Sequence, residues 1–311
     1  MNIQQFQYVL AVAETRHFET AASKCFITQS TLSTMISKLE EEIGIKIFDR
    51  KKKPVELTTE GKLLIEQLKT IIKDIQQLEE LTKEIKGEIK GNLSISVIPT
   101  IAPFLLPLFL QDFATQFPEL NIVVKEETTK EIIRQIKSRE LDIGIVSTPL
   151  NDADINEIEL YNEPFVFYDA KNTVLKTTSV TKINMTNLCL LEEGHCMRTQ
   201  IIKLCEMHKK DFSTNLNFEY KAGSIDSLLR FVKVNKASTL LPYLAQIDFT
   251  KNEKNHISEF SPPIPFRSVG IVTHRHFVKK KISGMLQQAI QSKVAILLPN
   301  NQFKGKKLNP L

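Results

Sequence analysis

Apolar residues near the start of the chain recur at spacings of three and four, which is typical of helices that bury one face. The pattern predicts helices over residues 2–13, 18–25 and 29–42. A three-residue turn, Phe26-Ile27-Thr28, separates the second helix from the third, and Thr28 is a suitable N-cap for the third. Two helices joined by so short a turn indicate a helix-turn-helix.

The third of these helices has an apolar stripe and a small, hydroxyl-rich outer face. Such a face can enter a major groove and reach phosphates and base edges. A solvated surface would explain the helix alone, but a basic hairpin at residues 47–58 follows it and favours DNA binding. The positive charge is local, because residues 1–92 hold 14 basic and 14 acidic side chains. The expected DNA contacts are Gln29, Ser30, Thr31, Ser33, Thr34 and Lys38 from the helix, and Arg50, Lys51, Lys52 and Lys53, which would hold phosphates, from the hairpin.

Residues 59–86 contain no proline and have Gly61 as their only glycine. Their apolar side chains alternate at spacings of four and three, with Thr82 filling one place, which is the seam of a coiled coil. We expect a helix of roughly 40 Å that pairs with its copy in a second subunit; packing against its own domain is the alternative. The dimerisation residues would be Leu64, Leu68, Ile71, Ile75, Leu78 and Ile85.

From Leu93 the pattern changes to strands alternating with helices. Strands are expected at 93–97, 122–124 and 142–146, with helices at 104–117 and 130–138 between them. Strands and helices in this order predict an α/β fold with a parallel sheet.

A second lobe is expected to begin near Glu163 and to return near Arg267, with residues 269–272 as the returning strand. Clefts between such lobes are common ligand sites. The expected domains are a DNA-binding domain at 1–58, a linker and dimerisation helix at 59–90, and a two-lobed regulatory domain at 91–311, with lobe I at 91–162 and 269–311 and lobe II at 163–268.

The composition, 42% hydrophobic and 25% charged residues, is typical of a soluble globular chain. No apolar run reaches the 18 or so residues that a membrane helix needs, and the first residues lack the features of a signal peptide. A cytoplasmic location without a membrane partner follows. Residues 275–311 hold eight basic and no acidic side chains, which is typical of a solvated end.

Four cysteines, Cys25, Cys189, Cys196 and Cys205, show no metal-site spacing, and no cofactor is expected. Cys25 and Cys189 are interpreted as small buried side chains. Cys196 differs because a helix is expected to begin beside it, with His195 and Arg198 close by. These features favour the thiolate, which peroxide oxidises to a sulfenic acid.

Cys205 lies nine residues after Cys196. On one helix the two residues would be about 13.5 Å apart along the axis and on opposite faces. A disulfide needs Cα atoms within about 7 Å of each other. If both residues lie on one helix, a bond between them therefore requires that helix to unwind.

The N-terminal motifs resemble those of the LysR-type regulators. These motifs are Phe18-x-x-Ala21-Ala22, Thr28-Gln29-Ser30-x-Leu32-Ser33-x-x-Ile36-x-x-Leu39-Glu40 and Leu57-Thr58-x-x-Gly61. The resemblance implies a winged helix-turn-helix, a homodimer that pairs into a homotetramer, and a regulatory domain like a periplasmic binding protein. It also implies double-stranded promoter DNA and RNA polymerase as partners.

Two further motifs resemble the hydrogen peroxide sensors of this family, the OxyR group. They are Gly194-His195-Cys196-x-Arg198-x-Gln200 and Ile98-Pro99-Thr100-x-x-Pro103-x-Leu105-Leu106-Pro107. The resemblance implies an activator of oxidative-stress genes in which Cys196 reacts with peroxide and Cys205 is its disulfide partner. It places Thr100, Thr129 and His195 around hydrogen peroxide, with Arg198 and Arg267 near the thiol.

The sequence departs from this pattern at three places. Thr199 stands where the group has an acidic residue, Glu219 where well-known members have a histidine, and residues 234–238 replace a glycine-rich turn. Two other functions remain open. A LysR-type regulator of a small organic metabolite would not need Cys196, and a thiol peroxidase would leave the DNA-binding module unexplained. We therefore expect a regulator and not an enzyme.

Overall fold

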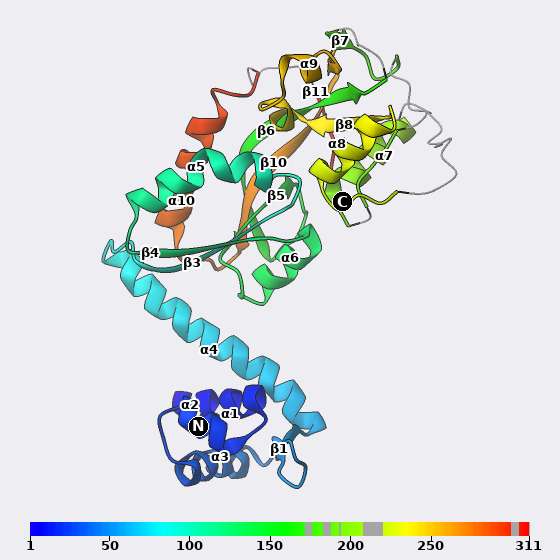
Figure 1. Cartoon of the computed structure of the whole chain (residues 1–311). Helices are drawn as coiled ribbons and strands as arrows, with labels where there is room; N and C mark the ends of the chain where they lie inside the picture. The colour runs from blue at the N-terminus through cyan, green and yellow to red at the C-terminus, as the bar shows by residue number, and fades with distance from the viewer. Residues whose placement is uncertain (172–175, 183–187, 193, 208–219, 300–304, 311) are drawn as a thin grey trace. The chain divides into compact units, whose positions relative to one another are not determined.

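The computed structural model divides into two compact units, Met1–Lys86 and Gly87–Leu311 (Figure 1). It describes residues 1–171, 176–182, 188–192, 194–207, 220–299 and 305–310, without the side chains of residues 205–207.

Three short helices form the core of the first unit: α1 (Ile3–Thr15), α2 (Phe18–Lys24) and α3 (Gln29–Ile43). The Thr28 hydroxyl accepts a hydrogen bond from the Thr31 backbone N–H at 3.2 Å and so caps α3, as expected. Gly44 ends α3 with φ +70°, a conformation that glycine adopts without strain. The predicted helices are confirmed to within two residues at each end.

A hairpin and a long helix complete the first unit. Strands β1 (Phe48–Asp49) and β2 (Glu56–Leu57) pair antiparallel, and α4 (Thr59–Ile85) follows at once. Gly61 lies so close to the Ile47 carbonyl oxygen that a Cβ atom would collide with it. The absence of a Cβ atom at Gly61 therefore lets the start of α4 approach the Ile47 backbone closely.

The second unit opens with the predicted βαβ order. Strands β3 (Gly91–Val97), β4 (Leu120–Glu126) and β5 (Ile143–Thr148) are parallel. Helices α5 (Ala102–Gln116) and α6 (Thr129–Lys137) make the crossovers. The prediction of a parallel sheet is confirmed for these three strands.

Two long strands extend this sheet, and the first of them, β10 (Ile264–His274), runs opposite to β3, β4 and β5. Strand β6 (Ile155–Asp169) pairs antiparallel with β10, and β10 pairs antiparallel with β5. The sheet order is therefore β4-β3-β5-β10-β6-β9-β7, with β8 on β6 and β11 on β10, nine strands in the described part of the chain. The other strands are β7 (Thr177–Thr178), β8 (Ser238–Pro242), β9 (Ile257–Phe260) and β11 (Gly305–Lys307).

Two apolar cores lie along the long strands. The first lies around β3, β5, α5 and α10 (Lys280–Val294) and includes Phe109. The second lies around β6, β8, α7 (Cys196–Met207) and α8 (Ile225–Val234) and includes Phe167. Short helices η1 (Tyr243–Gln246) and α9 (Lys251–Lys254) complete the fold. Of the helices described, none has the length and apolar content to cross a membrane.

The packing of α6 on the sheet predicts opposite effects at two glycines. A Cβ atom on Gly144 would lie 2.5 Å from Cγ2 of Ile132 and 2.7 Å from Cγ2 of Val272. Gly144→Ala should therefore reduce the free energy of unfolding by about 1–3 kcal/mol. Gly284, inside α10, has no atom within 4 Å of its Cβ position, so Gly284→Ala should gain about 0.5–1 kcal/mol. Urea unfolding of both variants would measure this, and equal effects would contradict the packing.

Candidate functional site

The outer face of α3 is exposed where DNA contacts are expected. Gln29, Ser30, Thr31, Thr34 and Lys38 are exposed, and Ser33 is partly buried. The hydroxyl groups near the start of the helix lie together: Thr28 Oγ1 is 3.0 Å from Ser30 Oγ and 2.8 Å from Thr31 Oγ1. The helix therefore presents a row of small polar groups to solvent.

The four basic residues of the hairpin lie in different environments. Lys51 and Lys53 are exposed. Lys52 Nζ lies 2.6 Å from Glu56 Oε2, and this hydrogen bond raises the pKa of Lys52. The Arg50 guanidinium is bound to α3, where it donates to Ser33 Oγ at 2.9 Å. Phosphate binding by these four residues stays a prediction.

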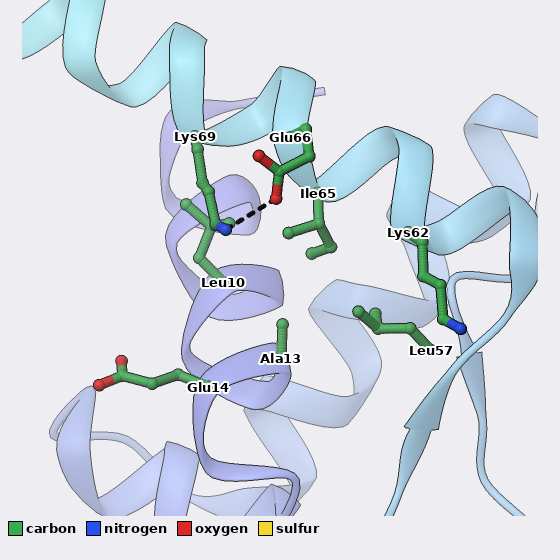
Figure 2. A pocket seen from close by; sticks show the side chains of 8 residues that line it. All are labelled: Leu10, Ala13, Glu14, Leu57, Lys62, Ile65, Glu66 and Lys69. Carbon is green, nitrogen blue, oxygen red and sulfur yellow. Dashed lines mark hydrogen bonds and ion pairs between the residues drawn. The ribbon is translucent and has the colours of Figure 1, made fainter. Parts of the chain in front are cut away.

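A hollow of about 440 Å³ lies between α1, β2 and α4 (Figure 2). Its floor is apolar, and charged side chains surround it, with Lys69 Nζ 2.8 Å from Glu66 Oε1. The lining consists of Leu10, Ala13, Glu14, Leu57, Lys62, Ile65, Glu66 and Lys69. None of these lining residues is a cysteine, so the hollow is not the site of the predicted thiol chemistry.

The predicted seam of α4 has two different surroundings. Leu68 is only 8% exposed, and Leu64 and Ile71 pack against the same core of the first unit. Leu78 and Ile85 are 62% and 76% exposed. The first half of the seam thus packs within its own unit, which was the alternative interpretation, and the second half is an exposed apolar surface.

Cys196 is the first residue of α7, as expected, and is buried. Its Sγ donates to Ser147 Oγ at 3.6 Å. Ser147 lies on β5 and is fully buried. Sequence reasoning missed Ser147, although a hydroxyl at the end of an apolar strand was a signal that could have found it.

A cavity of about 360 Å³ adjoins Cys196. His195 and Thr129 line it, so the structure brings these two predicted residues together at the thiol. Thr129 Oγ1 is buried and has no hydrogen-bond partner among the described residues. It is therefore available to a small polar ligand. The remaining lining residues are Lys130, Ile133, Gly194, Thr199 and Pro310.

Thr100 does not line this cavity but accepts hydrogen bonds from Arg267. Arg267 donates from Nη1 to Thr100 Oγ1 at 3.0 Å and from Nη2 to the Thr100 carbonyl at 2.9 Å. Its Nε donates to Glu163 Oε2 at 2.9 Å, and Glu163 Oε1 accepts from the Leu244 N–H. Glu163 was not predicted as a site residue.

Burial acts to lower the pKa of Arg267, but Glu163, Tyr161 and Cys196 outweigh it and raise the pKa above its ordinary value. Arg267 therefore stays charged although it is only 1% exposed. Arg198, the other predicted arginine, donates to the Leu191 carbonyl at 2.9 Å.

Cys25 and Cys189 do not line the cavity beside Cys196. Cys189 is buried in the second core and Cys25 packs against the core of the first unit. Burial raises the pKa of both thiols, and Lys24 partly offsets this at Cys25. No group of three or more potential metal ligands occurs in the part of the chain that is described.

The backbone of α7 includes both Cys196 and Cys205. The two cysteines therefore meet the condition under which a disulfide requires unwinding. Of the departures from the family pattern, Thr199 lines the cavity, and Lys236 adopts φ +50° without being glycine. Glu219 lies outside the described residues.

Comparisons with known proteins match both units. Residues 3–62 match the model of the bacterial regulatory helix-turn-helix protein, lysR family, and residues 86–291 match the LysR substrate binding domain. The hydrogen peroxide-inducible genes activator of Haemophilus influenzae is 31% identical over 278 residues, which are 88% of this chain and 90% of that protein. The DNA-binding transcriptional dual regulator OxyR of Escherichia coli K12 is 30% identical over 297 residues, covering 94% and 96%.

Solved structures agree with these matches. A full-length OxyR of Pseudomonas aeruginosa with a cysteine-to-aspartate substitution has a TM-score of 0.71 and 27% identity, covering 94% of this chain and 98% of that one. A cysteine-to-serine mutant of Corynebacterium glutamicum OxyR with hydrogen peroxide bound has a TM-score of 0.61 and 25% identity, covering 95% and 94%. The two family models together match residues 3–62 and 86–291, and this chain belongs to the LysR family of bacterial helix-turn-helix regulators.

Proposed function

We propose that this chain is a transcription regulator that senses hydrogen peroxide through a Cys196–Cys205 thiol/disulfide switch and controls oxidative-stress genes. The observation that carries the proposal is the position of Cys196, beside a cavity, hydrogen-bonded to Ser147 and within the field of Arg267. The names of its relatives support peroxide as the oxidant.

The reaction has two steps. The Cys196 thiol loses its proton and the thiolate attacks one peroxide oxygen: an S–O bond forms, the O–O bond breaks, and the departing hydroxide takes up the proton that the thiol lost and leaves as water. The Cys205 thiol then attacks the sulfenic sulfur, an S–S bond forms and the S–O bond breaks. The oxygen leaves as a second water with the proton of Cys205. Two thiols and one peroxide thus give one disulfide and two waters.

Each polar group near the thiol has a role in the first step. Arg267, oriented by Glu163 and Thr100, stabilises the thiolate by its charge. Ser147 fixes the sulfur, and Thr129 and His195 hold the peroxide by hydrogen bonds from the cavity wall. Arg198 secures the loop before α7 through its bond to Leu191.

The second step changes the fold. Because nine helical steps separate the two cysteines by roughly 13.5 Å, the segment between them must unwind. Met197, Ile201 and Leu204 are at most 1% exposed in the second core, and they leave this packing when the helix unwinds. The displaced apolar side chains bias the regulatory domain toward a different subunit arrangement.

We also propose the assembly that such a regulator needs. The chain forms a homodimer through α4, pairs into a homotetramer, binds double-stranded promoter DNA in the cytoplasm and contacts RNA polymerase. The domains run over residues 1–58, 59–90 and 91–311, with lobe II at 163–268. Each oxidation changes the state of one regulator, so the chain acts as a switch and not as an enzyme.

Substitution of the cysteines separates the two steps. Cys196→Ser should abolish promoter activation by peroxide, because no thiolate remains at the cavity. Cys205→Ser should still form the sulfenic acid at Cys196 but no disulfide, and its response should be weakened or short-lived. Mass spectrometry of both cysteine peptides, before and after mild peroxide, measures each product. Cys189→Ala is the control and should respond normally, because that thiol is buried away from the cavity.

A full peroxide response in Cys196→Ser would refute the redox mechanism. It would favour a small organic ligand in the cavity, whose 360 Å³ lies in the usual range for ligand sites.

Charge placed on the exposed half of the seam should break the dimer. Leu78→Asp combined with Ile85→Asp puts two carboxylates where an apolar interface forms, and burying them is costly. We expect a smaller species in sedimentation velocity. The control, Thr70→Asp with Gln76→Asp, adds the same charge to exposed positions of α4 outside the seam. If both double variants sediment like the native protein, α4 is not the dimer interface.

A further inference from the structure

A buried carboxylate near the end of α3 connects this helix to the hairpin. Glu40 is 2% exposed. Its Oε1 accepts hydrogen bonds from the Ile47 N–H at 2.8 Å and the Phe48 N–H at 3.2 Å. Its Oε2 lies 3.4 Å from Lys46 Nζ and 3.3 Å from Arg50 Nη2. A buried carboxylate needs such partners to offset its lost hydration, so Glu40 fixes both the hairpin strand and Arg50.

Arg50 in turn reaches the outer face of α3. Nη1 donates to Ser33 Oγ at 2.9 Å, and Nη2 donates to Ser37 Oγ at 3.1 Å. The guanidinium also lies over the Phe18 ring, 5.0 Å from its centroid. Contacts to α2 and α3 therefore hold the Arg50 guanidinium in place, although the sequence alone predicts Arg50 as a phosphate-binding residue.

These bonds determine what the two serines can offer to DNA. A hydroxyl has one proton to donate and two lone pairs that accept, whereas arginine only donates. Because Arg50 occupies a lone pair of each serine, the hydroxyl protons of Ser33 and Ser37 stay available, and neither serine donates a hydrogen bond to another described residue. Phosphate oxygens and the purine N7 and O6 atoms in the major groove are acceptors.

We propose that Arg50 is a positioning residue for DNA recognition, which turns the hydroxyls of Ser33 and Ser37 into donors and fixes the hairpin relative to α3. Glu40 holds Arg50 in this position. The proposal concerns the DNA-binding unit and is independent of peroxide sensing. It assigns direct phosphate contacts in the hairpin to the exposed lysines and not to Arg50.

The test uses the full chain and a DNA duplex that the wild-type protein selects from a random-sequence library. Arg50→Lys keeps the charge but loses the planar fork that bridges two serines. We expect its affinity to fall about tenfold, the effect of losing about one net hydrogen bond's stabilisation, with an unchanged slope of log K against log salt. Lys51→Gln, the comparison variant, should flatten that slope by about one unit if Lys51 holds one phosphate.

A double-mutant cycle then separates positioning from general stability. In a Ser33→Ala, Ser37→Ala background, Arg50→Lys should cost little further affinity, because the hydroxyls that it orients are gone. The serine variants touch neither Glu40 nor Phe18 and remain informative if Arg50→Lys is unstable in thermal unfolding. Two results would overturn the proposal: losses that add fully across the cycle, or a slope that flattens by about one unit in Arg50→Gln, which indicates a direct phosphate contact.

Discussion

A buried ion pair between Arg267 and Glu163 joins the two long strands on which the regulatory unit is built. The residues are direct partners in the pairing of β10 with β6, where these strands pass from one apolar core to the other. Buried ion pairs contribute little net stability compared with apolar side chains. Removing one partner, however, leaves an unpaired buried charge, which costs about 3–5 kcal/mol. The same pair holds the Arg267 guanidinium in place, and Cys196 is among the groups that act electrostatically on Arg267.

The first unit, Met1–Lys86, which contains the DNA-binding helices, also has a glutamate that holds an arginine in position. The buried carboxylate of Glu40 accepts a hydrogen bond from Arg50, and Arg50 donates to two serine hydroxyls. In the same way Glu163 accepts from Arg267, and Arg267 donates to the Thr100 hydroxyl. The two arginines differ in burial, because Arg267 is 1% exposed whereas the Arg50 side chain is 37% exposed, so the carboxylate offsets lost hydration mainly at Arg267. The guanidinium is then able to orient neighbouring groups with its planar donors, a task that the flexible ammonium of lysine performs poorly.

The local elements could be predicted from sequence because helical and strand periodicity depend only on near neighbours. The helices of the first unit and the first three parallel strands are examples. The position of β10 between β5 and β6 could not be predicted, because the pairing of strands that are distant in the chain produces no periodic pattern in the sequence. Arg50 was grouped with three lysines because composition cannot show which basic side chain is hydrogen-bonded to the neighbouring helix. Glu40 did carry a signal, since it follows Ile36 by four residues and so falls on the buried stripe of its helix.

The strand order has a consequence for biosynthesis. β10 lies between β5 and β6 in the sheet but leaves the ribosome after both, whereas the helices of the first unit are complete within the first 86 residues. Until β10 is made, β5 and β6 each have an unpaired edge, and such edges promote association with other chains. The DNA-binding unit can fold during translation, but the sheet must wait for almost the whole chain. Nascent chains that stop before residue 264 therefore carry a finished DNA-binding unit joined to an aggregation-prone half-sheet.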